Sequence, residues 1–124
     1  MLRRSMRLGR GNGLRASEAE RIGERMHKMV VLYNEPNDPA HFRKYYVETH
    51  VPLAEKMPGL KASRYAFDVK TLGPGKAPFC VFEAEFEDEA ALMDALRSPE
   101  GKAVAKDVPN YATGGATMLH YKVA

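Results

Sequence analysis

His50 has the residue type and the position best suited to acid–base chemistry, because it lies on the apolar face of a predicted helix. An imidazole titrates near neutral pH, so a neutral one in an apolar cleft can take a proton from a phenol or a carbon acid. Tyr46, about one helical turn earlier, is the candidate polar partner of His50 and could donate a hydrogen bond to a substrate oxygen. A structural interpretation stays open, in which His50 is a buried histidine that bonds a backbone carbonyl and helps to end the helix.

Four other residues are candidate substrate contacts, although each could instead have a purely structural role. Tyr45 could donate its hydroxyl and Tyr65 could form the opposite wall of a cleft, although large aromatic residues more often pack in a core. Phe42 shares the helix face of His50. Asn110 could donate its amide to a ligand or merely close a turn, which is the commoner role of such residues.

The other histidines do not have metal-ligand spacing. His41 and His50 are nine residues apart, which at about 100° per residue places them on opposite faces of the helix. His27 precedes the first predicted strand and His120 is isolated on the last one. The segment Gly73-Pro74-Gly75-Lys76 lacks the length of a phosphate-binding loop and the helix after it, and Gly9-Arg10-Gly11-Asn12-Gly13 follows no strand. We therefore expect no metal and no tightly bound cofactor.

The helix that carries His50 is predicted to begin at Asp38 and Pro39, an N-cap followed by proline at the first helical position. Pro52 has no N–H to donate to the carbonyl of Glu48 and biases its predecessor away from helical angles. A kink or break is therefore expected between these two residues, followed by a turn up to Met57. The stripe expected to face the core is Phe42, Tyr45, Tyr46, Thr49, His50, Leu53 and Met57.

The remaining pattern predicts an α+β protein. Strands are expected at 28–33, 60–69, 79–86 and 116–123, with helices at 38–57, 89–97 and a short one at 98–107. This βαββαβ order is the ferredoxin-like unit, a four-stranded antiparallel sheet with two main helices on one face. The first and last strands are apolar on both faces, so the open face would be unusual for a monomer. A homodimer with two sheets packed face to face, an α+β barrel, is expected.

Composition fits one globular domain. The chain has 124 residues, of which 44% are hydrophobic and 28% are charged. Cys80, the single cysteine, excludes an intramolecular disulfide and lies in an apolar run, which favours a buried structural thiol. No apolar run reaches the roughly eighteen residues of a membrane span, so we expect no membrane association and a reducing, cytoplasmic setting.

The net charge of +3 comes from the N-terminal part of the chain. Residues 1–25 contain seven arginines and three glutamates, which leaves 12 basic and 13 acidic residues for the predicted domain at 26–124. That domain is nearly neutral, which argues against nucleic acid as a partner. Residues 1–25 are expected to be a disordered or partly helical Arg-rich extension, with Ser17 as a possible N-cap. It could be an extension without function before a true start at Met26 or Met29, which we favour, or a targeting peptide or basic arm.

Several motifs resemble one known family. They are Phe42-x-x-Tyr45-Tyr46-x-x-x-His50-x-Pro52-Leu53, Pro58-Gly59-Leu60, Ser98-Pro99-Glu100-Gly101 and Asn110-Tyr111-Ala112-Thr113-Gly114-Gly115. In these positions the chain resembles the EthD family, named for a protein of ethyl tert-butyl ether degradation, in the dimeric α+β barrel superfamily. The resemblance covers about residues 28–123 and implies a homodimer with a cleft between the sheet and the helices. Relatives in that superfamily include cofactor-free oxygenases, decarboxylases, isomerases, cyclases and haem-degrading enzymes.

Three functions follow as hypotheses. The first is a small enzyme without a tightly bound cofactor, in which His50 and Tyr46 act on a hydrophobic, aromatic or oxygenated molecule. Its reaction would be of the oxidoreductase, decarboxylase or isomerase type, in a degradative or secondary-metabolite pathway. The second is a non-catalytic auxiliary protein that binds a metabolite or assists a pathway oxygenase. The third and weakest is a haem-binding protein with His50 as the axial ligand.

Overall fold

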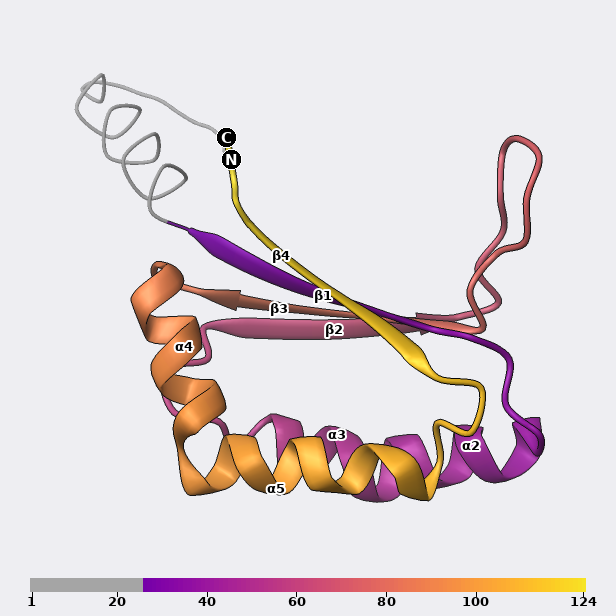
Figure 1. The fold of residues 1–124 in the computed structure, drawn as a ribbon, viewed down its shortest axis with the longest axis horizontal. Helices are drawn as coiled ribbons and strands as arrows, with labels where there is room; N and C mark the ends of the chain where they lie inside the picture. Colours follow the sequence, from indigo (N-terminus) through magenta and orange to yellow (C-terminus); the bar gives the residue numbers. More distant parts are fainter. Residues whose placement is uncertain (1–25) are drawn as a thin grey trace, which may run out of the picture.

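The computed structural model describes residues 26–124, which form a four-stranded antiparallel sheet with helices on one of its sides (Figure 1). The strands are β1 (His27–Tyr33), β2 (Ala62–Phe67), β3 (Cys80–Phe86) and β4 (Ala116–Lys122), in the spatial order β2-β3-β1-β4. The helical segments are α2 (Pro39–Tyr45), the π-helical η1 (Tyr46–His50), α3 (Val51–Ala54), α4 (Glu89–Arg97), α5 (Pro99–Asp107) and the 3-10 turn η2 (Val108–Asn110). The predicted ferredoxin-like fold is confirmed.

The core lies between the two central strands and the helices. Buried and partly exposed residues alternate along β1 and β3, as expected for strands with one covered face. Val31 pairs with Phe82 of β3 and with Met118 of β4, so these three side chains share the helix-facing side. Cys80 is fully buried on the same side, which agrees with the predicted structural thiol.

The first helix changes from α to π geometry where Pro52 was predicted to interrupt it. The N–H of Val51 donates to the carbonyl of Tyr46, five residues earlier, instead of to the residue four before it. Pro52 then lies in the first turn of α3, where its missing N–H is tolerated. The predicted interruption is therefore present as a wide turn, and the helical path continues through it.

The π turn alters which residues of this helix face the core. Phe42, Tyr46, His50 and Met57 are buried as predicted. Thr49 is exposed, so its predicted place in the buried stripe is wrong, because the wider turn moves it away from the core. The residues buried in addition are Val51 and Ala54.

Asp88 and Ser98 cap α4 and α5, since each lies directly before the first residue of its helix. The side chain of Asp88 accepts from the N–H of Ala91 at 2.8 Å, and that of Ser98 accepts from the N–H of Gly101 at 3.0 Å. A Cβ on Gly101 would lie 2.0 Å from the carbonyl oxygen of Ala95. Only glycine permits this close approach, which holds the start of α5 against α4.

Strand β2 is shorter than the predicted span of 60–69. The strand ends at Phe67, and Asp68 follows with a positive φ of 57°. The Asp68 carboxylate pairs with Arg43 Nη2 at 2.9 Å, and the Arg43 guanidinium lies 4.6 Å from the ring centroid of Phe67. These contacts tie the end of β2 to α2.

The predictions for residues 1–25, including the cap at Ser17, lie outside the described residues. Within residues 26–124, no helix has the length and apolar character needed to cross a membrane.

Candidate active site

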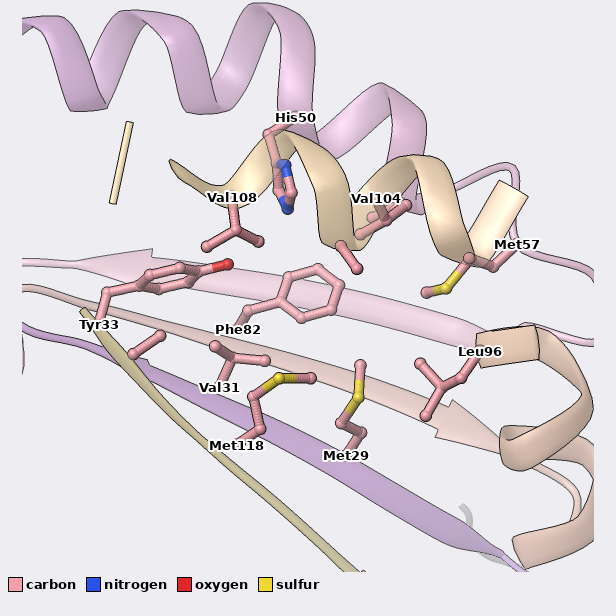
Figure 2. Close-up of a pocket in the computed structure, with 14 residues that line it drawn as sticks. Met29, Val31, Tyr33, His50, Met57, Phe82, Leu96, Val104, Val108 and Met118 are labelled. Carbon is pink, nitrogen blue, oxygen red and sulfur yellow. The ribbon is translucent and has the colours of Figure 1, made fainter. Parts of the chain in front are cut away.

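A cavity of about 270 Å³ lies between the sheet and helices α3 and α5 (Figure 2). Its lining side chains are apolar except for those of Tyr33 from β1 and His50 from η1. Figure 2 shows the imidazole of His50 and the hydroxyl of Tyr33 near one end of the cavity, with Met57 and Leu96 toward the other. The cavity therefore has one polar end and one apolar end.

His50 projects from the π turn into the cavity and is only 3% exposed (Figure 2). Its Nδ1 lies 2.9 Å from Oδ2 of Asp107, the last residue of α5. A carboxylate can only accept, so the proton of the neutral imidazole is on Nδ1 and the lone pair is on Nε2. Nε2 has no hydrogen-bond partner within the described part of the chain. Burial lowers the pKa of His50, and the opposing effect of Asp107 does not cancel it, so the ring is neutral near pH 7.

Asp107 is the centre of a hydrogen-bond network that holds His50. Its Oδ1 accepts from the hydroxyl of Tyr45 at 2.5 Å and from Nδ2 of Asn110 at 2.9 Å. Burial alone would raise the pKa of this carboxyl group, but the hydrogen bonds from Tyr45, His50 and Asn110 outweigh it and lower the pKa. Asp107 is therefore an ionised carboxylate that orients the imidazole and can stabilise its protonated form.

Tyr46 and Tyr111 enclose the imidazole of His50. The ring of Tyr46 stacks on it with centroids 5.4 Å apart, and the ring of Tyr111 lies 4.6 Å away. The hydroxyl of Tyr111 contacts the hydroxyl of Tyr33 at 2.7 Å. The hydroxyl of Tyr46 is buried and has no hydrogen-bond partner among residues 26–124, and burial raises its pKa.

The structure places the other sequence candidates in different surroundings. Tyr45 and Asn110 contact Asp107, and neither lines the cavity. Phe42 is fully buried in an aromatic cluster with edge-on contacts, including one to Phe79 at 4.9 Å. Tyr65 is 39% exposed on β2 and does not line the cavity.

Asp107, Tyr33 and Tyr111 are site residues that the sequence reasoning did not single out. A signal for Asp107 existed, because Gly101, Val104 and Asp107 recur at three-residue intervals on one face of α5. A carboxylate on an apolar helix face is as unusual as the histidine that was noticed. For Tyr33, the sequence predicted only that it ends the first strand.

His27 and His120, predicted to be separate, lie side by side across β1 and β4. His27 Nε2 is 2.9 Å from His120 Nδ1, so the description of His120 as isolated is wrong. The cause is strand pairing between segments 93 positions apart, which spacing along the chain does not show. Nevertheless, no group of three or more potential metal-ligating side chains occurs among residues 26–124.

The lining of the cavity does not fit a haem. His50 could serve as an axial ligand, but the carboxylates of a haem are usually paired with basic groups, and no lysine or arginine lines the cavity. We therefore derive no chemistry through haem.

Comparison with solved structures shows that this fold carries different activities. A hydroxynitrile lyase from Passiflora edulis is 17% identical, with a TM-score of 0.65 over 82% of this chain and 95% of that one. A cofactor-independent oxygenase from Streptomyces nogalater is 18% identical, with a TM-score of 0.55 over 78% and 91%. A dimeric protein of unknown function and ferredoxin-like fold from Bacteroides fragilis is 17% identical, with a TM-score of 0.58 over 78% and 95%. At these identities the likeness shows the fold alone.

A family model and two relatives of higher identity place the chain in a family. The EthD domain matches residues 34–115. An uncharacterized 11.0 kDa protein of the thcB-thcC intergenic region of Rhodococcus erythropolis is 38% identical over 96 residues, 76% of this chain and 91% of its own. An ethyl tert-butyl ether degradation (EthD) family protein from Bacillus halodurans is 31% identical, with a TM-score of 0.71 over 77% of this chain and 96% of that one. The chain therefore belongs to the EthD family.

Proposed function

We propose that the protein binds a hydrophobic organic molecule in the cavity and removes a proton from it, with His50 as the general base. The observation that carries this proposal is the hydrogen bond from His50 Nδ1 to Asp107, which leaves the lone pair of Nε2 for a ligand. A general base of this kind must be neutral and within reach of the proton that it abstracts. The buried imidazole of His50 is neutral, and it lines the cavity in which a bound molecule would lie within its reach.

Asp107 gives the base its strength. When His50 takes a proton it becomes an imidazolium, which burial alone would make unfavourable. The ionised carboxylate 2.9 Å away stabilises that charge without being protonated itself. Proton abstraction helped in this way typically contributes about 10²–10⁴-fold in rate. Such a reaction needs no tightly bound cofactor, and it could belong to an isomerase, a decarboxylase or an oxidoreductase.

The relatives support this proposal at the level of the fold. The proteins with the same fold include one named as a hydroxynitrile lyase and one named as a cofactor-independent oxygenase. The alternative, a non-catalytic auxiliary protein, would need only an apolar cavity. The buried network around Asp107 favours the enzyme, because a carrier of apolar molecules has no use for an oriented base.

Base-promoted ring opening of 5-nitrobenzisoxazole tests the proposal without knowledge of the natural substrate. The base removes the ring C–H proton, the N–O bond breaks, and a coloured nitrile phenolate forms with no other reactant. We expect saturable acceleration of about 10²-fold or more over buffer. His50→Ala should return the rate to that of buffer, and His50→Gln covers the case in which the alanine variant does not fold. His120→Ala is the matched control, because His120 is exposed, does not line the cavity and contacts His27 on the neighbouring strand.

A rate that survives in folded His50→Gln would overturn the proposal. Binding of 5-nitrobenzisoxazole without turnover by the native protein would favour the auxiliary function instead.

We also propose that the protein is a homodimer that packs its open sheet faces together. The face away from the helices carries Leu119 at 46% and Tyr121 at 47% exposure, which pair with Val30 and Lys28 of β1. Burial of such a patch is the usual reason for association. The Bacteroides fragilis protein of this fold is described as dimeric.

Light scattering at micromolar concentration should give twice the chain mass. Leu119→Glu should halve it, because it places a charge in the buried interface. Leu72→Glu should leave it unchanged, since Leu72 is fully exposed in the loop after β2. A monomeric native protein would contradict the dimer.

A further inference from the structure

Three tyrosine hydroxyl groups are buried beside the polar end of the cavity. Tyr33, Tyr46 and Tyr111 are 2%, 0% and 1% exposed, and their ring centroids lie 5.3–5.6 Å apart. They come from β1, η1 and the segment after η2, so three distant parts of the chain meet here. Such a cluster is unusual, because a buried hydroxyl normally finds a hydrogen-bond partner.

These hydroxyls have more protons to donate than the hydrogen bonds that they make with one another. The contact between Tyr33 and Tyr111 at 2.7 Å uses one proton of that pair, and no other hydrogen bond to either oxygen occurs within residues 26–124. The hydroxyl of Tyr46 has no hydrogen-bond partner in the same part of the chain. Since each hydroxyl has one proton to donate, at least one donor of the cluster remains unused.

Tyr33 is the member of the cluster that reaches the cavity. It lines the cavity, whereas Tyr46 and Tyr111 do not. Its hydroxyl lies at the same end as the imidazole of His50 (Figure 2). When Tyr111 donates to Tyr33, the proton of Tyr33 is free for a ligand oxygen next to the base.

We infer that the hydroxyl of Tyr33, supported by Tyr111, is an oxygen-binding subsite, and that the substrates are ketones or related carbonyl compounds with an acidic C–H beside the carbonyl group. The inference rests on the proposed function for its base, and it adds the chemical class of the substrate. The apolar remainder of the lining, with Met29, Met57 and Met118, suits a hydrocarbon body of variable shape.

The reaction balances without another reactant. The C–H bond beside the carbonyl breaks, its proton forms a bond to Nε2 of His50, and the electron pair moves to the carbonyl oxygen. The resulting enolate oxygen accepts the hydrogen bond of Tyr33, which strengthens as negative charge develops there. Return of the proton to another carbon completes an isomerisation. In D₂O a solvent deuteron first replaces the proton on Nε2, and its transfer to the same carbon completes an exchange.

The hydroxyls remain donors throughout the useful pH range. Burial raises the pKa of Tyr33, and it raises that of Tyr111 far above the ordinary value. A phenolate at this position would repel the enolate, and burial prevents it from forming.

The test uses 2-tetralone, a two-ring ketone, and tetralin, the same ring system without the oxygen. Exchange of the tetralone C1 protons in D₂O is followed by NMR, and binding of both compounds is measured by calorimetry. Tyr33→Phe should slow exchange by about 10²–10³-fold, the usual effect of removing one donor to an oxyanion. It should also weaken binding of tetralone several-fold and leave tetralin unchanged. Tyr111→Phe should have a smaller effect of the same kind.

Tyr121→Phe is the control, since Tyr121 lies on the open sheet face and not in the cavity, and the variant retains the ring that the proposed dimer would bury. Equal exchange and equal tetralone binding in native protein and Tyr33→Phe would overturn the inference, even if His50→Gln abolishes ring opening of 5-nitrobenzisoxazole. Conversely, a preference for tetralone that depends on Tyr33 in a protein without exchange activity would support the subsite and contradict His50 as the base.

Discussion

Two histidines in this protein, His50 and His27, each have a ring nitrogen at the same distance from a hydrogen-bond partner, but the partners differ in kind. His50 Nδ1 lies 2.9 Å from a carboxylate oxygen of Asp107, and His27 Nε2 lies 2.9 Å from Nδ1 of His120. Both His50 and His27 are buried, at 3% and 6% exposure. The pairs differ in that His50 lines the cavity, whereas neither His27 nor His120 does.

The difference shows that the partner determines what a buried histidine can do. The carboxylate of Asp107 accepts only, so it selects one tautomer of His50 and leaves the other nitrogen as a base. In the pair of His27 and His120 either ring can be the donor, and the contact links β1 to the edge strand β4. We therefore propose that the pair of His50 and Asp107 takes part in proton transfer, and that the pair of His27 and His120 helps to hold β4 on β1.

Among changes to the two pairs, Asp107→Asn should cause the largest loss of activity. An amide can donate to Nδ1, which favours the wrong tautomer and removes the charge that stabilises the imidazolium. We expect kcat/KM for 5-nitrobenzisoxazole to fall about 10²-fold or more. His120→Gln, which breaks the other pair, should retain nearly all activity. Equal losses in both variants would show that the two pairs are not functionally different.

The pH dependence of the free energy of unfolding should show a smaller effect, which comes from His50. Burial lowers the pKa of His50 below its usual 6.5, so the unfolded chain binds a proton first as the pH falls through that value. Stability therefore declines below about pH 6.5, with a slope of at most about 1.4 kcal/mol per pH unit from this group. The lowered pKa of Asp107 adds a loss only below its usual 3.8, as the pH falls through the value in the folded protein.

Urea unfolding between pH 5 and 8 measures this slope. His50→Gln should reduce it, because the variant has no imidazole whose pKa burial can lower. A slope unchanged in His50→Gln would mean that the pKa of His50 is the same in the folded and the unfolded protein, which would contradict its burial as the cause of a lowered pKa.

The fold could be predicted because its signals are local. Asp38, Asp88 and Ser98 each cap a helix within three residues, and Pro52 marks the place of the π turn. The form of that turn was not predictable, because Pro52 shows only that one α-helical hydrogen bond is lost. Which bond replaces it depends on the packing of the whole helix on the sheet.

The site could be predicted only in part, because its contacts join distant segments. His50 was found from its place on an apolar face, but Asp107 is 57 positions away and Tyr33 and Tyr111 are 78 positions apart. Spacing along one helix cannot show which side chain of another helix lies opposite. Tyr45 and Asn110 were proposed as substrate contacts, and the structure shows both of them on Asp107.

Tyr45→Phe should produce the smallest effect, and it tests whether the donors to Asp107 support the base. The variant removes the hydroxyl that donates to Oδ1 and retains the ring that stacks on Tyr111 at 5.9 Å. The pKa of Asp107 should rise, and kcat/KM should fall by up to about 10-fold, because one hydrogen bond is worth about 1 kcal/mol. Tyr121→Phe is again the matched control. A loss as large as that of Asp107→Asn would mean that the Tyr45 hydroxyl itself contacts the substrate, as the sequence first indicated, whereas no loss would mean that His50 and Asn110 alone hold the carboxylate.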